Sequence, residues 1–179
     1  MTGGLVLLKR GIMSKNLEFK VGERVVYPSH GVGEVIEVEE QMIADIKLKV
    51  YVISFPQDKM TLRVPVNRAS AVGLRTLVNK SDVHEVYTIL QGKPKRGNKM
   101  WSRRAQEYET KINSGEITAI AEVVRDLYKN IDNDRSYSER TIYESALNRL
   151  SSEIAILENI SETDSSSKLI DLLRDKIAA

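Results

Sequence analysis

Between Phe19 and about Leu77, apolar and polar positions alternate as they do in β-strands. In the segment 60–66 every second residue is apolar, which gives a strand one apolar face. Other strand-like stretches lie at 25–27, 35–39 and 48–55, and the segments 28–33 and 56–59 have the composition of turns. Four or five short strands in about 55 residues predict an antiparallel curled sheet or small barrel. Because Pro65 cannot donate to a ladder, its strand is expected at an edge with an open side.

From Ser81 onward the apolar positions recur every three or four residues, which is the period of helices. Gly92 can close the first helix, and Ser136 with Glu139 has the spacing of a capping box at the start of the fourth. We therefore predict an α+β chain in which five helices form a bundle after the sheet. The predicted apolar stripes are Val83, Val86, Tyr87 and Leu90; Trp101, Ala105, Tyr108 and Ile112; Ile117, Ile120, Ala121, Val124, Leu127 and Tyr128; Tyr143, Leu147, Leu150, Ile154 and Leu157; and Leu169, Leu172, Leu173 and Ile177.

The composition is that of an ordinary globular protein, with 179 residues, 41% of them hydrophobic and 29% charged. No apolar run is long enough to cross a bilayer, and there are no cysteines for disulfides or thiolate metal sites. We expect a cytoplasmic monomer without a membrane segment. The predicted organisation is a disordered lead over residues 1–17, a first domain over 18–77 and a helical domain over 78–179.

Positive charge is concentrated in one short segment, 93–104 (KPKRGNKMWSRR). It holds six Lys or Arg and no acid, whereas residues 105–179 hold nine Lys or Arg against fifteen Asp or Glu. The net charge of the whole chain is only +2. Such a focus favours contact with a polyanion at one place, although a solvated basic linker would have the same composition.

The sequence contains no set of residues with the types and spacing of an active site or a metal site. His30 falls in a turn and His84 on a polar helix face, and neither has further ligands at metal spacing. The glycine pair Gly31 and Gly33 lacks the third glycine and the following helix of a dinucleotide site. We predict a protein that is not an enzyme and has no cofactor or bound metal.

Trp101 is the one tryptophan of the chain, and it lies among Lys99, Arg103 and Arg104. Its spacing to Ala105 is that of a helix stripe, so it can simply belong to the core. It can also lie at an exposed helix end, where an aromatic ring wedges against a base while the cations hold phosphates. The residues by themselves leave both interpretations open.

Five stretches resemble, in the same order, motifs of the CarD/CdnL family of bacterial transcription regulators. The resemblance extends from roughly Phe19 to Leu157, most of the chain, and the five motifs in order are far more specific than any one of them. The stretches are FKVGERVVYPSHGVGEVIEVEE (19–40), LRVPVNRASAVGLR (62–75), MWSRR (100–104), SGEITAIAEVVRDLY (114–128) and SYSER (136–140).

The resemblance implies an N-terminal Tudor-like (SH3-like) barrel that binds the β subunit of RNA polymerase through an exposed edge strand. The R-V-P motif of the family falls on Arg63, Val64 and Pro65. The alternation of this strand places Arg63 opposite the apolar face, so its side chain is expected to be free to meet a partner.

In the helical domain the resemblance implies DNA binding. The family tryptophan falls on Trp101, with the implied role of a minor-groove wedge at the upstream edge of the promoter bubble, and Arg103 and Arg104 match the two arginines after it. Arg140 stands at a usually basic position at the start of the next helix. Two residues depart from some relatives: Gln41 and Gln106 replace an interface arginine and a lysine.

These implications together predict a regulator with two partners, the polymerase β subunit and double-stranded promoter DNA at the upstream fork. Such a protein would stabilise the open complex and would be associated with the nucleoid. One alternative is a protein interaction module without wedge activity. Another is a stand-alone architectural protein, which would bind free duplex tightly and with a steep salt dependence.

Overall fold

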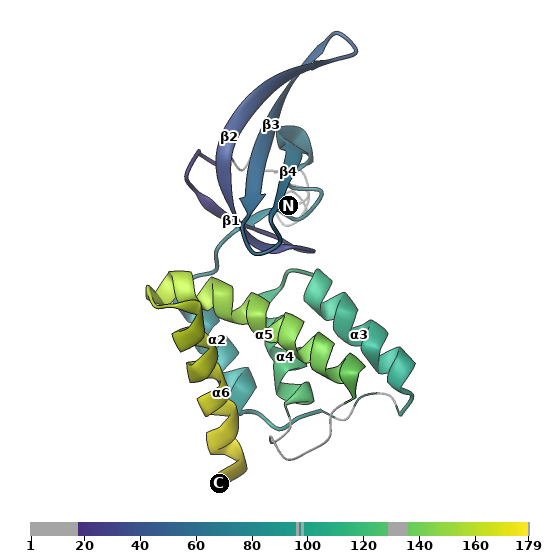
Figure 1. Cartoon of the computed structure of the whole chain (residues 1–179), viewed down its shortest axis with the longest axis vertical. Coiled ribbons are helices and arrows are strands. Elements are labelled where there is room, and N and C mark those ends of the chain that lie inside the picture. The colour runs from purple at the N-terminus through teal and green to yellow at the C-terminus, as the bar shows by residue number, and fades with distance from the viewer. Residues whose placement is uncertain (1–17, 96, 98, 129–135, 179) are drawn as a thin grey trace, which may run out of the picture. The chain divides into compact units, whose positions relative to one another are not determined.

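The computed structural model describes residues 18–95, 97, 99–128 and 136–178. The chain divides into two compact units (Figure 1). The described part of the first, here the sheet unit, comprises residues 18–25 and 33–75; the second, here the helical unit, comprises residues 26–32 and the chain from Thr76 onward. This α+β arrangement, with strands first and helices after, is the one that the change of period predicts.

The strands form one five-stranded sheet in the order β4-β3-β2-β1-β5. β2 pairs antiparallel with β3, and β3 with β4. β4, which contains Pro65, lies at an edge of this order, so the edge position expected from that proline is confirmed. The described strands do not close into a barrel. Their bounds are β1 Arg24–Tyr27, β2 Gly31–Ile43, β3 Ile46–Phe55, β4 Met60–Pro65 and β5 Arg75–Thr76.

One face of the sheet carries the core of the sheet unit. Tyr51, Ile53 and Phe55 alternate along β3 and are almost fully buried. Phe19 packs edge-on against the Tyr51 ring at 5.5 Å, and its backbone N–H donates to the Tyr51 hydroxyl at 3.1 Å. Gly33 must lack a side chain, because a Cβ there would approach Ile53 and Phe55 to within 2.8 Å. Burial along the middle of β3 is continuous and not alternating, so this strand contributes more to the core than a strict period of two predicts.

The β2–β3 hairpin is longer than the sequence pattern predicts. β2 has 13 residues whereas β4 has 6, so the hairpin extends past the edge strand as a two-stranded ribbon (Figure 1). Ala44 and Asp45 between the strands both have positive φ, 49° and 62°, as a tight two-residue hairpin turn requires. Neither is the glycine that normally marks such a turn, which explains why the hairpin end was not foreseen.

The helices that the structure describes are the five that were predicted. They are α2 Lys80–Gln91, α3 Trp101–Asn113, α4 Ile117–Leu127, α5 Tyr137–Glu158 and α6 Glu162–Ala178. Their stripes meet in one core, to which α4 contributes most densely and α6 contributes Leu169 and Leu173. The side chain of Ile177 lies outside the described residues. None of the described helices is long and apolar enough to span a membrane.

The turn that joins β1 to β2 belongs to the helical unit. Arg149 of α5 donates to the carbonyl oxygens of Pro28 at 2.8 Å and of Ser29, and also to that of Ile112 at 3.2 Å. Gly115 has φ +73°, and a Cβ on it would lie 2.9 Å from Pro28. One guanidinium therefore binds the 28–29 turn and the end of α3 to the same helix.

Candidate interfaces for nucleic acid and protein

Two helices begin at the same end of the helical unit. α3 begins at Trp101 and α5 at Tyr137, and Figure 1 shows both starts side by side. An ion pair of 3.6 Å between Arg104 Nη2 and Glu139 Oε1 joins them. Because the N-terminus of a helix carries a partial positive charge, two neighbouring N-termini make this end favourable for anions. We call it the Trp101 end and define it by Lys99–Arg104 and Ser136–Arg140.

Trp101 is neither fully in the core nor free of it. Its side chain is partly exposed, yet it packs against the helical core and lies 6.4 Å, ring centroid to ring centroid, from Tyr108. The Arg104 guanidinium lies over the indole ring at 5.1 Å from its centroid. Both interpretations of the sequence thus describe a part of this residue, because it packs against the core and is still partly exposed.

Arg104 is already engaged by its own protein. In addition to Trp101 and Glu139, its aliphatic stem meets the backbone at Gly97, where a Cβ would come within 3.2 Å of Arg104 Cδ. Its Nε is buried and has no acceptor among the described residues. Arg104 thus holds the tryptophan ring in place, whereas Lys99, Arg103 and Arg140 are exposed.

The first turn of α3 has backbone N–H groups that no side chain caps. Its N-cap is Met100, which makes no side-chain cap bond. In α5, by contrast, the Ser136 hydroxyl accepts from the Glu139 N–H at 3.2 Å, as the capping-box spacing predicts. The Glu139 carboxylate is directed to Arg104 of the neighbouring helix. Among the described residues α3 thus lacks the side-chain cap that α5 has, and amides of an uncapped first turn suit an acceptor such as a phosphate.

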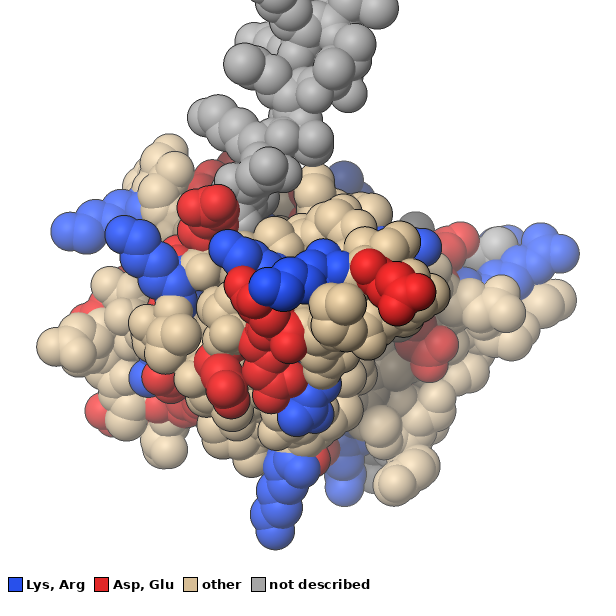
Figure 2. Space-filling model, turned by 90° about the horizontal axis from the view of Figure 1, so that it is seen from above, with Lys and Arg blue, Asp and Glu red and all other residues tan. Residues whose placement is uncertain are grey.

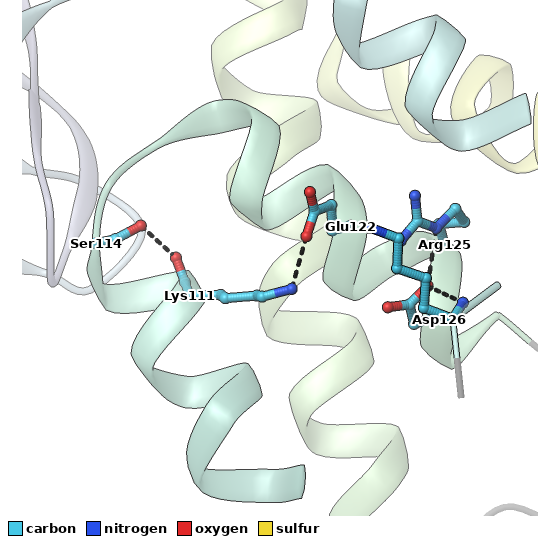
Figure 3. A network of polar contacts seen from close by, with 6 residues as sticks. Lys111, Ser114, Glu122, Arg125 and Asp126 are labelled. Atoms are coloured by element: carbon cyan, nitrogen blue, oxygen red, sulfur yellow. Dashed lines mark hydrogen bonds and ion pairs between the residues drawn. The ribbon is translucent and has the colours of Figure 1, made fainter. Parts of the chain in front are cut away.

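The basic segment 93–104 is hydrogen-bonded, near its own beginning, to the last turn of α4 (Figure 3). Asp126 Oδ1 accepts from the Lys95 backbone N–H at 2.9 Å and from Arg125 Nε at 2.8 Å. Both members of the Arg125–Asp126 ion pair are almost fully buried, at 7% and 5% side-chain exposure. The beginning of the segment is therefore hydrogen-bonded to α4 at Lys95. Arg96 lies outside the described residues.

A second contact in Figure 3 fixes α3 itself. Lys111 Nζ lies 2.6 Å from the Glu122 carboxylate of α4, and this hydrogen bond holds the pKa of Glu122 below its ordinary value. The helix that begins with Trp101 is therefore joined to α4 near its last turn, and to α5 near its first turn through Arg104.

The periodicity did not single out two exposed residues at the Trp101 end. Met100 is 57% exposed and Tyr137 is 85% exposed, the highest value among the large hydrophobic residues described as exposed. Neither lies on a helix stripe. Their signal in the sequence is local: each directly adjoins a helix start that also carries basic residues.

Arg63 is exposed on β4 but is not free of partners. Its Nε lies 3.3 Å from Glu39 Oε2 of β2, and the same oxygen accepts from Gln41 Nε2 at 3.1 Å. The hydrogen bond from Arg63 holds the pKa of Glu39 below its ordinary value. Strand alternation thus places Arg63 on the exposed face, as expected, but it does not reveal the Glu39 partner two strands away.

The other two residues of the R-V-P motif differ from Arg63 in exposure. Val64 is buried, at 5% exposure, and Pro65 is intermediate. A partner at this edge can therefore meet the backbone of β4 and the side chain of Arg63, but not the side chain of Val64.

Acidic and basic side chains are interspersed on the face drawn in Figure 2, without a broad field of one sign there.

A polar cluster lies at the other end of α5. Glu158 accepts hydrogen bonds from the Tyr87 hydroxyl and from Lys168 Nζ, the latter at 2.8 Å. The Lys168 ammonium also lies 4.9 Å from the centre of the Tyr87 ring. A cavity of about 450 Å³ adjoins this cluster, lined by Lys80, Val83, His84, Tyr87, Leu157 and Glu158. Among the described residues, no group of three or more potential ligands can hold a metal ion.

The fold thus defines a class of two-part chains, with an open-edged sheet unit and a helical unit that carries a basic end. Comparison with known proteins identifies the class. Residues 19–78 match the CarD-like/TRCF RID domain, and residues 85–171 match the C-terminal domain of CarD. The chain belongs to the CarD family. It is 29% identical over 145 residues to "Putative transcription factor YdeB" of Bacillus subtilis (strain 168). The aligned region covers 80% of this chain and 95% of that protein.

Proposed function

We propose that this CarD-family transcription regulator binds the RNA polymerase β subunit through β4 and stabilises the open promoter complex through the Trp101 end. The single observation that carries the proposal is the state of Trp101: it packs against the core, remains partly exposed and lies beneath the Arg104 guanidinium, at a helix end that also carries exposed cations. In this proposal residues 18–77 are a Tudor-like polymerase-binding domain and residues 78–179 bind DNA. The protein would act as a cytoplasmic monomer with the nucleoid.

Attachment to polymerase is supported by the CarD-like/TRCF RID match and by the edge position of β4. An edge strand can extend its sheet by pairing with a strand of a partner, which uses backbone hydrogen bonds for affinity and side chains for specificity. At this edge Arg63 would supply the specificity, because Val64 is buried.

Contact with DNA is supported by the chemistry of the Trp101 end. Arg103, Lys99 and Arg140 would hold phosphates, as would the uncapped amides of α3. The Trp101 ring would wedge against the upstream base pair of the bubble, and the exposed Met100 and Tyr137 would widen the apolar contact. Arg104 would act as a positioning residue for the ring.

The two contacts would act together by mass action. Attachment to polymerase raises the local concentration of the Trp101 end at the promoter, so weak DNA binding suffices. A wedge that binds open DNA more tightly than closed DNA shifts the equilibrium by that difference in affinity. Few base contacts are involved, so sequence specificity would be low.

The test is the lifetime of an open complex formed by purified bacterial RNA polymerase, with wild type, Trp101→Ala, Trp101→Phe and Arg63→Glu. We expect wild type to lengthen the lifetime, Trp101→Ala and Arg63→Glu to lose the effect, and Trp101→Phe to retain part of it. A wild type that saturates polymerase without any change in lifetime would refute the wedge and favour a pure interaction module. Tight, salt-sensitive binding to free duplex without polymerase would favour an architectural protein.

A further inference from the structure

Arg63 and Glu39 lie on the same face of the sheet, on either side of β3. In the ladders Glu39 is opposite Val50 and Arg63 is opposite Val52. Residues 50 and 52 of one strand point to the same side, and residues that face each other in a ladder share a side. The Arg63 side chain therefore lies across β3 and reaches Glu39 on β2.

The ion pair uses only one part of the guanidinium. Nε of Arg63 is engaged, whereas its terminal nitrogens, Nη1 and Nη2, have no hydrogen-bond acceptor among the residues that the structure describes. A guanidinium is planar and its donors form a rigid fork. When Nε is held, the direction of the terminal nitrogens is held too. The pair thus orients the end of Arg63 and leaves it available.

Glu39 is well suited to hold another residue. Its side chain is 24% exposed against 55% for Arg63, and Gln41 donates to the same carboxylate oxygen from two residues away on β2. The carboxylate is thus constrained from its own strand. The lowered pKa of Glu39 agrees with a carboxylate that remains charged at neutral pH.

We propose that Glu39 is a positioning residue for polymerase binding, which pre-orients Arg63 so that its terminal nitrogens meet a planar acceptor on the polymerase. This inference rests on the proposed function. The experiment distinguishes this role from the opposite one, in which the negative charge of Glu39 competes with the polymerase for Arg63. The two roles differ in sign: loss of a positioning residue weakens binding, and loss of a competitor strengthens it.

The experiment measures the dissociation constant of the full-length protein for purified bacterial core RNA polymerase. Glu39→Ala is expected to weaken binding by about 2- to 10-fold, the range for immobilising one long side chain on association. Glu39→Gln keeps an acceptor oxygen for Arg63 Nε but removes the charge, so binding should stay within about 2-fold of wild type. Circular dichroism melting of each variant verifies that it is folded.

The matched control is Glu40→Ala. Glu40 is the next residue of β2, lies on the opposite face, and forms an exposed ion pair of 3.5 Å with Lys47. The Glu40→Ala variant should bind polymerase as tightly as wild type does. Glu39→Ala binding as tightly as wild type, or more tightly, would overturn the inference while leaving the proposed function intact. Wild type that fails to bind core polymerase would instead refute the proposed function and, with it, this inference.

Discussion

The two candidate contact surfaces of this protein are constructed in different ways. At the Trp101 end the residues proposed to meet DNA are also structural: Trp101 packs on the core, and Arg104 joins two helices. On the β4 face, Arg63 is held by one ion pair at the surface. At the first surface, stability and function share side chains, whereas at the second they can be separated. Mutations at the two surfaces therefore need different controls.

The largest effect on stability is expected for Asp126, whose carboxylate pairs with Arg125 and binds the basic segment at Lys95. Asp126→Ala would leave Arg125 buried without its carboxylate and would free the Lys95 amide. The free energy of unfolding should fall by about 3–5 kcal/mol, as for other broken buried pairs. Urea denaturation measures it. The control is Asp171→Ala, from an exposed pair with Arg174, which should change stability by less than about 0.5 kcal/mol. Equal stability of the two variants would mean that the basic segment is not anchored at Asp126.

A moderate effect is expected for Trp101 itself. Trp101→Ala should lower the free energy of unfolding by about 1–3 kcal/mol, less than for a fully buried tryptophan, because the ring is partly exposed. Trp101→Phe should retain most of this stability. Thermal melting of both variants, beside the open-complex lifetimes, separates packing from DNA contact. If Trp101→Ala melts as wild type does, the ring contributes nothing to the core and the comparison drawn above fails.

A smaller effect on stability is expected for Glu158, at the end of α5 away from Trp101. This helix has 22 residues and so extends about 33 Å from the Trp101 end. Burial alone would raise the pKa of Glu158, but hydrogen bonds from Lys168 and Tyr87 outweigh it and lower the pKa. A lowered folded-state pKa stabilises the protein above the ordinary carboxyl value of 4.5, and this contribution is lost as the pH falls through the folded-state value.

The free energy of unfolding should therefore decrease between pH 7 and pH 4 more in wild type than in Glu158→Gln. The difference should be about 1 kcal/mol or less, because Lys168 is half-exposed. Urea titrations at both pH values measure it. Parallel pH profiles in the two proteins would show that this cluster adds no pH-dependent stability.

The smallest effect on stability is expected for Arg63→Ala. Its ion pair with Glu39 is exposed, so melting should be almost unchanged, within about 0.5 kcal/mol. Binding to core polymerase should nevertheless be lost or strongly reduced, whereas Lys47→Ala, from the exposed pair on the other face, should bind normally. A large loss of stability in Arg63→Ala would remove the contrast between the two surfaces.

Much of the fold could be predicted from periodicity. All five helices and the edge position of β4 followed from spacing and from Pro65, because burial of one face is a local, repeating requirement. The end of the β2–β3 hairpin did not follow, since Ala44 and Asp45 are not typical of its turn.

The candidate contact residues were harder to predict. Their types and their concentration in one segment could be seen, but not their partners. Arg63 pairs with a residue 24 positions away, and Arg104 pairs with Glu139, which the capping-box spacing assigned to its own helix. Such pairings depend on which elements lie side by side, and no local pattern contains that information.

The Arg149 contacts limit how the protein can be dissected. The turn at Pro28 and Ser29 precedes most of the sheet in the chain, yet Arg149 binds its carbonyl oxygens within the helical unit. A fragment that starts at Thr76 would leave this guanidinium without two of its acceptors, and its behaviour would not represent the helical unit of the intact chain. Work with separate halves, including fusion or exchange of domains between relatives, should therefore supply residues 26–32 to the helical half.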